Sequence, residues 1–365
     1  MIKEGNTEIY DCELNIESPV FIGCGKSYGK KEFIYNSQTK TVKIINIPKF
    51  FNIVIDKGLI SEYEKFILLN AYCNLYDFTK AYFSDSEIDK ITVYTCSAND
   101  AFDAKHTLSE IQQFSRTHDG KPYIPGSSIK GALKTCILAK MINNNPAAAQ
   151  NYIKNYVSDD RNLNSKKENL SDNYMNILAL NNNKNNDAVN NIMRTLSVSD
   201  SEPIDILSMT LCKKVDIYVN GESSKNGKVV RECIKPGTKV KFKINIDRSM
   251  DGITYDAIVD AINFFSEEYQ NKIAAKFELN EKAVKPDYKG KLLLGGGVGY
   301  FSKTEVYTTF DYENALKIAV KIMMKNFKNH YHDKDIEKGI SPHTIKYTEY
   351  GNKFVPFGLC KLSMK

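Results

Sequence analysis

The segment 123–135 (YIPGSSIKGALKT) combines small hydroxyl residues, a helix start and two lysines at helical spacing. Ser127 or Ser128 can cap the helix by accepting a hydrogen bond from a backbone N–H that has no partner in the helix. Lys130 and Lys134 are four residues apart and therefore lie on one helix face. Free N–H groups at a helix start, together with two ammonium groups, attract anions, so the segment predicts a phosphate site. The alternative is an ordinary capped amphipathic helix with solvated lysines.

Two glycine-rich segments offer a second kind of phosphate contact, because glycine lets a backbone approach a ligand closely. The segment 295–299 (GGGVG) precedes a tyrosine that could stack on a base and a lysine that could meet a phosphate. A second pair of glycines follows the first expected strand and precedes another lysine. In each case a tight turn without a ligand is the alternative. The candidate contacts are Gly23, Gly25, Lys26, Gly295, Gly296, Gly297, Gly299, Tyr300 and Lys303.

The five histidines and eight cysteines give little support to metal or redox chemistry. No cysteine pair has CxxC spacing, so neither a zinc ribbon nor a disulfide framework is indicated. His118 could act as a general acid or base, as could His106, although a solvated loop histidine is the favoured interpretation. His330 and His332 could bind a metal together, but without further ligands at a recognisable spacing a polar cluster at a helix end is preferred. We therefore expect no metal and no cofactor.

Composition is that of a globular protein, and the net charge says little about partners. Of 365 residues, 50 are basic and 44 are acidic, which gives a formal net charge of +6. Most basic residues are lysines, which are mobile point charges and suit sequence-independent phosphate contacts. A lysine-rich composition unrelated to any ligand is the alternative. Residues 1–11 lack a signal-peptide core and no apolar run approaches the roughly 18 residues of a membrane span, so we expect a cytoplasmic protein without membrane contact.

Strand and helix patterns follow each other without a strict βαβ alternation, which favours an α+β fold. Strands are expected at 8–16, 32–35 and 41–47, the last two forming a hairpin. A helical region from about 51 to 82 and a connecting segment from 92 to 118 follow. The helix that begins near Ser128 should bury the stripe Ile129, Ala132, Leu133, Cys136 and Ile137.

The sequence changes character between 141 and 191, where asparagine supplies 17 of 51 residues. Such a composition disfavours a packed core, so a partly helical insertion is expected. Strand-like sequence resumes from 194 to 218. A second unit should then contain an alternating strand after Pro236, two helices and a last strand at 359–364. We expect two domains that are diverged copies of each other, at residues 1–235 and 236–365.

The motif 123–135 closely resembles that of the RAMP proteins of CRISPR effector complexes. Residues 14–25 resemble the first strand and loop of that family, and residues 292–304 resemble its glycine-rich loop. Together with 194–201 (RTLSVSDS) and 355–361, their order is most similar to the fifth-subunit family of the type III-A (Csm) complex. The resemblance implies two RRM-like (ferredoxin-like) domains, with the Asn-rich segment inserted in the first.

The resemblance also implies a non-catalytic RNA-binding subunit that caps the 3′ part of the CRISPR RNA and supports its 3′-end maturation in antiviral defence. Its implied partners are the CRISPR RNA, the backbone RAMP subunit, the small helical subunit and host nucleases. RAMP subunits that cut target RNA carry an aspartate after the first strand, and residues 23–33 contain none. The family usually has a tryptophan in the glycine loop; its absence leaves Val298 or Tyr300 for apolar contacts. The alternative function is a metal-independent CRISPR RNA-processing endoribonuclease that uses His118.

Overall fold

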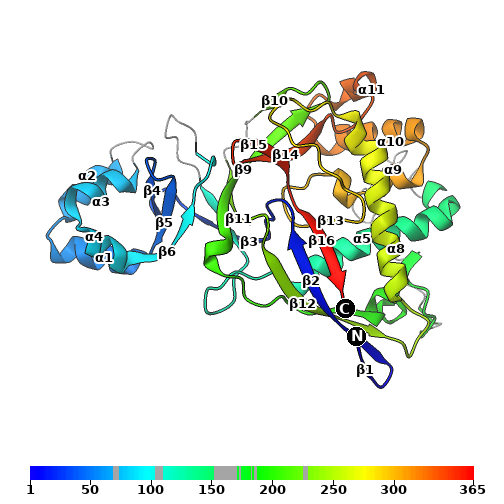
Figure 1. The fold of residues 1–365 in the computed structure, drawn as a ribbon. Coiled ribbons are helices and arrows are strands. Elements are labelled where there is room, and N and C mark those ends of the chain that lie inside the picture. The colour runs from blue at the N-terminus through cyan, green and yellow to red at the C-terminus, as the bar shows by residue number, and fades with distance from the viewer. Residues whose placement is uncertain are drawn as a thin grey trace.

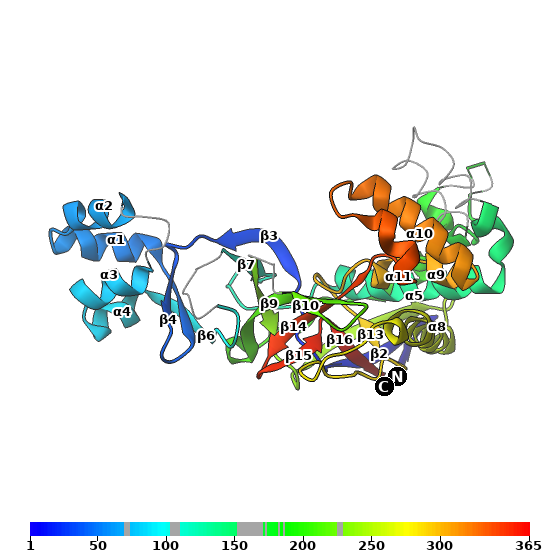
Figure 2. The same ribbon diagram turned by 90° about the horizontal axis from the view of Figure 1, so that it is seen from above.

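The structure is a computed structural model that describes residues 1–68, 74–102, 110–151, 171, 174–181, 183–184, 187–224 and 229–365. Two β-sheets form the centre of the chain, helices cover one side, and a helical lobe stands apart at the left of Figure 1. Figure 2 shows the same separation of the lobe from above. Across the described residues, we find no helix that combines the length and the apolar character needed to cross a membrane.

The first sheet is antiparallel throughout and has the N-terminal strand at its centre. Buried and more exposed residues alternate on β12, as the sequence predicts, and also on most of the central strand β2. A short first strand pairs with β2 as a hairpin. The strands are β1 (Ile2–Glu4), β2 (Thr7–Ile16), β8 (Leu196–Val198), β12 (Lys239–Asp247), β13 (Leu292–Leu293) and β16 (Leu359–Met364).

Two helices and four of these strands form a ferredoxin-like unit. The helices are α5 (Gly126–Asn144) and α8 (Tyr255–Glu268), which pack against each other and share the core of this sheet. In chain order the elements run β2, α5, β8, β12, α8, β16, and the strands pair in the order β16-β2-β12-β8. This is the split βαβ arrangement expected for the family. However, the unit draws its elements from both sides of Lys235, so a boundary at residue 235 does not separate two sheets.

The second sheet also mixes strands from the two expected domains. Its order is β3-β7-β11-β9-β6-β5-β4, and β14 adds to β9. The expected hairpin is confirmed as β4 and β5. The segment 92–118, expected to be a connection, instead supplies β6 and β7. Bounds are β3 (Gly23–Tyr28), β4 (Phe33–Asn36), β5 (Thr41–Ile45), β6 (Thr92–Ser97), β7 (Ile111–Phe114), β9 (Met209–Tyr218), β10 (Ser223–Ser224), β11 (Val230–Ile234), β14 (Thr344–Tyr350) and β15 (Lys353–Pro356).

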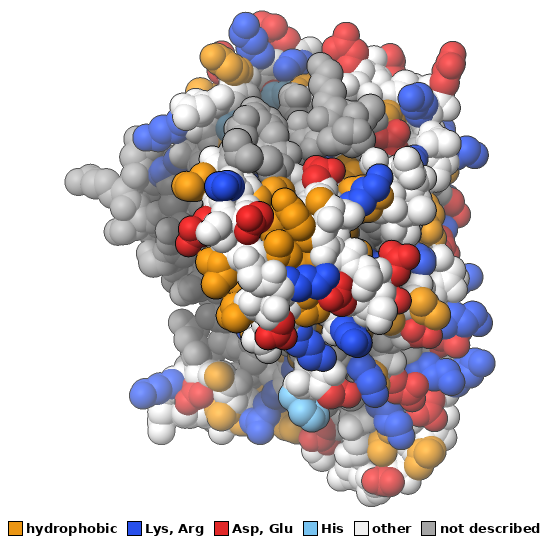
Figure 3. All heavy atoms as spheres, turned by 90° about the vertical axis from the view of Figure 1, so that its left-hand side faces the viewer, with side chains coloured by type: hydrophobic (Ala, Val, Ile, Leu, Met, Phe, Trp, Pro, Cys, Tyr) orange, Lys and Arg blue, Asp and Glu red, His pale blue; other side chains and the backbone are white. Residues whose placement is uncertain are grey.

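The helical lobe has a core of its own, built on aromatic contacts around Phe50. It contains α1 (Ile47–Asp56), α2 (Ile60–Leu68), α3 (Leu75–Tyr82) and α4 (Asp85–Ile91), and so confirms the predicted helical region. Ser84 and Glu87 begin α4 with a capping box. Figure 3 looks onto this side of the molecule, where hydrophobic side chains gather among charged ones. The most exposed apolar residues of α1 and α2 are Phe51, Ile55, Ile60, Ile67 and Leu68.

The C-terminal third adds α9 (Val306–Thr309), α10 (Tyr312–Asn326) and α11 (Asp335–Lys338) beside α5 and α8. Along α10, Leu316, Ala319, Val320 and Met323 share a buried face, whereas Phe327 at the C-cap is 47% exposed. Much of the Asn-rich segment, including 152–170, lies outside the described residues. Its described part includes the end of α5 and a buried asparagine, Asn190, whose amide donates to two backbone carbonyls.

Candidate nucleic-acid interface

Three segments singled out in the sequence are joined by backbone hydrogen bonds. The Ser18 hydroxyl accepts a bond of 2.8 Å from the backbone N–H of Leu359. The carbonyl of Pro19 accepts one of 2.9 Å from Gly358. Two residues further along the chain, the carbonyl of Phe21 accepts a bond of 2.7 Å from the N–H of Gly296. The glycine-rich segment also pairs directly with the closing segment 355–361, so all three segments lie against one another.

A pocket of about 460 Å³ opens where the segment around Gly23 and the 295–299 loop meet the start of α5. Most residues of its described lining are small and uncharged. The exposed Lys303 is the one charged residue among them. The hydroxyls of Ser127 and Ser128 make no hydrogen bond to any residue that the structure describes, so both can bind a ligand. The described lining is Ile22, Gly23, Ser127, Ser128, Gly131, Ala132, Thr135, Leu293, Gly295, Gly296, Ser302 and Lys303.

The cap of α5 differs from the prediction that Ser127 or Ser128 supplies it. Pro125 occupies the N-cap position and offers no side-chain hydrogen bond. Instead, the carboxylate of Asp200 accepts a bond of 2.8 Å from the N–H of Gly126. Part of the positive end of the helix is therefore compensated by a carboxylate of the chain itself, which leaves the two serine hydroxyls for other partners.

The two predicted lysines of α5 lie off the described lining of this pocket. Both Lys130 and Lys134 are half-buried. Burial lowers the pKa of the Lys130 ammonium, and the neighbouring charge of Lys134 lowers it further. Two like charges held close together in a partly desolvated position favour a nearby anion. Their role in RNA binding remains a prediction, at the margin of the pocket rather than inside it.

The first glycine pair lies within strand β3 rather than in a loop after a strand. Pairing with β7 is irregular between Gly23 and Ser27, and Gly25 has a φ of +79°. This bulge lies on the edge of the second sheet. A second pocket of about 340 Å³ shares Gly23 with the first and is also lined by Gly25 and Lys26. Gly23, Gly25 and Lys26, the predicted contacts of β3, therefore line one or both of two neighbouring pockets.

The glycines of the 295–299 loop serve packing as well as access. Gly295 has a φ of +93°, and a Cβ there would collide with the carbonyl of Phe21. A Cβ on Gly297 would come within 3.3 Å of the buried ring of Phe357, and one on Gly299 would meet the side chain of Lys346. Gly297 thus faces the core, so a side chain there would not test the approach of RNA.

The apolar residues of the same loop are turned inward. Val298 is 4% exposed and belongs to the main core. Tyr300 is half-buried, its ring contacts Phe301 edge-on, and its hydroxyl accepts a bond of 3.2 Å from Thr304. Neither residue is among the described lining of the larger pocket. Base stacking by Tyr300 therefore stays a prediction that the geometry does not favour.

Arg231 is a candidate contact that the sequence did not reveal. Its guanidinium lies over the ring of Phe21 at 5.5 Å, and burial lowers its pKa. Its Nε and Nη1 atoms are buried without a hydrogen-bond partner in the described chain. In the sheet, Arg231 pairs with Gln112, which itself pairs with Ser27, and both of these line the smaller pocket. A buried charge without a partner is costly, so this guanidinium is suited to an anionic ligand.

The histidine considered for catalysis, His118, lies in an exposed turn. His118 is exposed in the turn between Thr117 and Lys121, where their backbones are joined by a bond of 2.9 Å. It is not among the described lining of either pocket. His106 lies outside the described residues. His332, considered with His330 as a metal pair, is instead bonded to Asp335, as described below.

The family follows from comparison with known proteins. A model of the RAMP superfamily matches residues 13–302, which is more than half of the chain. The chain therefore belongs to the RAMP superfamily, as its motifs predicted. The match includes every described lining residue of the larger pocket except Lys303, which directly follows the matched range.

Several proteins similar to this chain share the name Csm5. The CRISPR system Cms protein Csm5 of Streptococcus thermophilus is 24% identical, over 79% of this chain and 77% of that protein. Csm5 of Enterococcus italicus is 24% identical over 98% of both chains. A chain of the cryo-EM structure of a Csm-crRNA-target RNA ternary complex aligns with TM-score 0.63 and 16% identity, covering 97% of this chain and 100% of that one. The crystal structure of T. onnurineus Csm5 aligns with TM-score 0.62 and 14% identity, covering 96% and 99%. The two structures establish the shared fold.

Proposed function

We propose that this protein is a non-catalytic, RNA-binding RAMP subunit of a type III-A (Csm) CRISPR complex. The observation that carries the proposal is the larger pocket, because residues of three distant segments meet there. Its free serine hydroxyls, close-approach glycines and single described lysine can hold a ribose-phosphate backbone without reading bases. The full-length similarity to proteins named Csm5 supports the same assignment.

Electrostatics extend the proposed RNA path from the larger pocket to the smaller one. Gly23 lines both, so one strand of RNA can pass over it from Lys303 toward Lys26. The guanidinium of Arg231 lies beside this path and would find in a phosphate the partner that the described chain does not give it. Binding of this kind is salt-dependent and tolerant of sequence.

The more specific role is that of capping the 3′ part of the CRISPR RNA. By covering the RNA backbone, the subunit would protect that end and support its maturation in antiviral defence. Its partners would be the CRISPR RNA, the backbone RAMP subunit, the small helical subunit and host nucleases. We propose that it does this in the cytoplasm and as two RRM-like units, of which the ferredoxin-like unit around β2 is one.

The test uses the purified full chain and labelled single-stranded repeat-containing RNA, with and without a chelator. We expect the protein to retain the RNA on a filter at low salt and to retain less of it at high salt. The RNA should stay intact with and without chelator. Absence of binding at low salt would refute the proposal. Chelator-resistant cleavage that disappears in His118→Ala would favour the endoribonuclease instead. Within a reconstituted complex, omission of this subunit should leave the 3′ end of the CRISPR RNA unprotected.

A further inference from the structure

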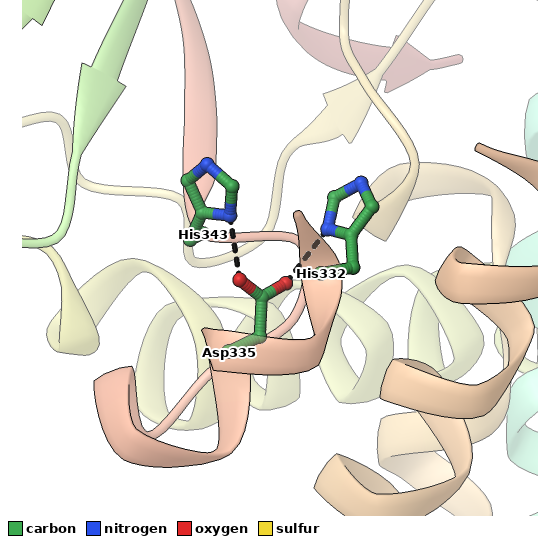
Figure 4. Close-up of side chains that lie close together, drawn as sticks. All are labelled: His332, Asp335 and His343. Carbon is green, nitrogen blue, oxygen red and sulfur yellow. Dashed lines mark hydrogen bonds and ion pairs between the residues drawn. The ribbon is translucent and has the colours of Figure 1, made fainter. Parts of the chain in front are cut away.

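Two imidazoles and one carboxylate converge at a buried position remote in sequence from the RNA-binding motifs. Asp335, at the start of α11, is fully buried. Its Oδ2 atom lies 2.8 Å from Nδ1 of His332, and its Oδ1 atom lies 2.5 Å from Nδ1 of His343. Figure 4 shows both rings with this nitrogen turned toward the carboxylate.

Three side chains that can each donate an electron pair to a metal lie together here. One ligand atom from each of the three residues lies within 4.8 Å of the others, and no second group of this kind occurs in the described parts of the chain. Imidazole nitrogen and carboxylate oxygen are the donors that zinc and neighbouring transition metals take from proteins. Two histidines and one carboxylate leave a further coordination position for water.

The surroundings hold the three side chains in place. The Ser341 hydroxyl donates a bond of 2.7 Å to Oδ2 of Asp335, as residues around metal ligands commonly do. The backbone of Ser341 is itself anchored in both directions by the hydroxyl of Tyr307. The ring of Tyr218 stacks on that of His343 with their centroids 5.8 Å apart, which fixes the orientation of the imidazole.

Charge also favours a cation at this position. A buried carboxylate needs a compensating charge, and the ion pairs described for Asp335 are with the two imidazoles alone. A neutral imidazole supplies a hydrogen bond but no charge. A divalent ion would bind Nδ1 of each ring, with the ring proton carried on Nε2, after the nitrogen and oxygen atoms move apart by a few tenths of an ångström.

We propose that His332, Asp335 and His343 form a binding site for a divalent transition metal, with Zn²⁺ as the ion that suits these donors. The ion would tie the segment before β14 to α11, and β14 in turn pairs with β9 of the second sheet. The three residues are not among the described lining of either candidate RNA pocket, so the proposed ion takes no part in phosphate binding there. It is independent of the proposed RNA binding.

The experiment uses the purified full chain, stripped with chelator and then titrated with Zn²⁺ alone. We expect one ion bound per chain and a higher melting temperature with the ion. When Co²⁺ replaces Zn²⁺, the visible absorption spectrum should be that of four- or five-coordinate Co²⁺. His343→Gln should abolish all three effects. The control is His330→Gln, because His330 is exposed and lies outside the ligand set; it should behave as the wild type.

Two results would overturn the proposal. One is a wild-type chain that binds no stoichiometric Zn²⁺ and melts at the same temperature with and without it. The other is unchanged binding in His343→Gln, which would assign the ion to other ligands. Should His343→Gln not fold, Asp335→Asn replaces it, since the amide keeps the size of the side chain and removes its charge. Should neither variant fold, the wild-type titration decides alone.

Discussion

Replacing Lys303 by alanine should weaken RNA binding in a way that salt titration can measure. Lys303 is exposed and is the charged side chain in the described lining of the larger pocket, so its loss removes one phosphate contact. For single strands, each contact contributes about 0.7 to the slope of log K against log salt. Between about 50 and about 200 mM KCl, a fourfold change, wild-type affinity should therefore fall about 2.6-fold more than that of the variant.

The assay is filter binding of labelled single-stranded RNA over a salt series. A matched control is Lys90→Ala, since Lys90 is an exposed lysine of α4 in the separate helical lobe and its loss changes the net charge equally. The control should keep the wild-type slope. A wild-type slope in Lys303→Ala, with RNA binding intact, would refute a phosphate at this lysine. Lys130→Ala combined with Lys134→Ala should have a smaller effect for each lysine, because both lie off the pocket lining.

Three further changes probe the structure around the interface. Asp200→Ala should lower the free energy of unfolding by about 1–2 kcal/mol in urea titration, because α5 loses its only described side-chain cap. Asp200→Asn should lower it by less. Equal stability of the wild type and both variants would contradict the cap. Arg231→Leu should weaken RNA binding yet raise the urea midpoint, since it removes a half-buried charge whose Nε and Nη1 atoms have no described hydrogen-bond partner. A lower midpoint would show that the contact with Phe21 and the rest of the fold satisfies the guanidinium. Burial alone would raise the pKa of the Asp216 carboxyl, but the ammonium groups of Lys346 and Lys214 outweigh it and hold the pKa below its ordinary value. Its contribution to stability is therefore present above about pH 4 and lost as pH falls through the lowered pKa, so Asp216→Asn should flatten the acid side of a stability-against-pH curve; a parallel curve would contradict the ion pairs.

Local patterns in the sequence were sufficient for the elements that present the interface. The alternating strand β12 and the helix α5 could be predicted because a buried face repeats every two residues in a strand and every 3.6 in a helix. Most of the predicted stripe of α5 is buried, while Ala132 lines the pocket. The candidates Gly23, Ser128 and Gly296 were indicated by local patterns and by the family resemblance, and they meet in one pocket.

What the sequence could not supply is the partner of each segment across long distances. No local pattern indicates that β2 pairs with both β12 and β16. Because of this pairing, residues from both sides of the boundary expected at residue 235 share one sheet. Asp200 caps a helix that begins 74 residues earlier, an arrangement that short-range capping rules do not reach.

The same limit explains the two polar sites that sequence reasoning missed. Arg231 resembles any strand arginine until the sheet brings it beside Phe21, where its Nε and Nη1 atoms are buried without a described hydrogen-bond partner. His332 was considered as a ligand with its neighbour in sequence, but its partners are Asp335 and His343. The sequence by itself determined the local elements and motif residues, because these depend on short-range periodicity and composition. Only the tertiary structure decided which charges and ligands face each other, since that depends on how the sheets and helices pack.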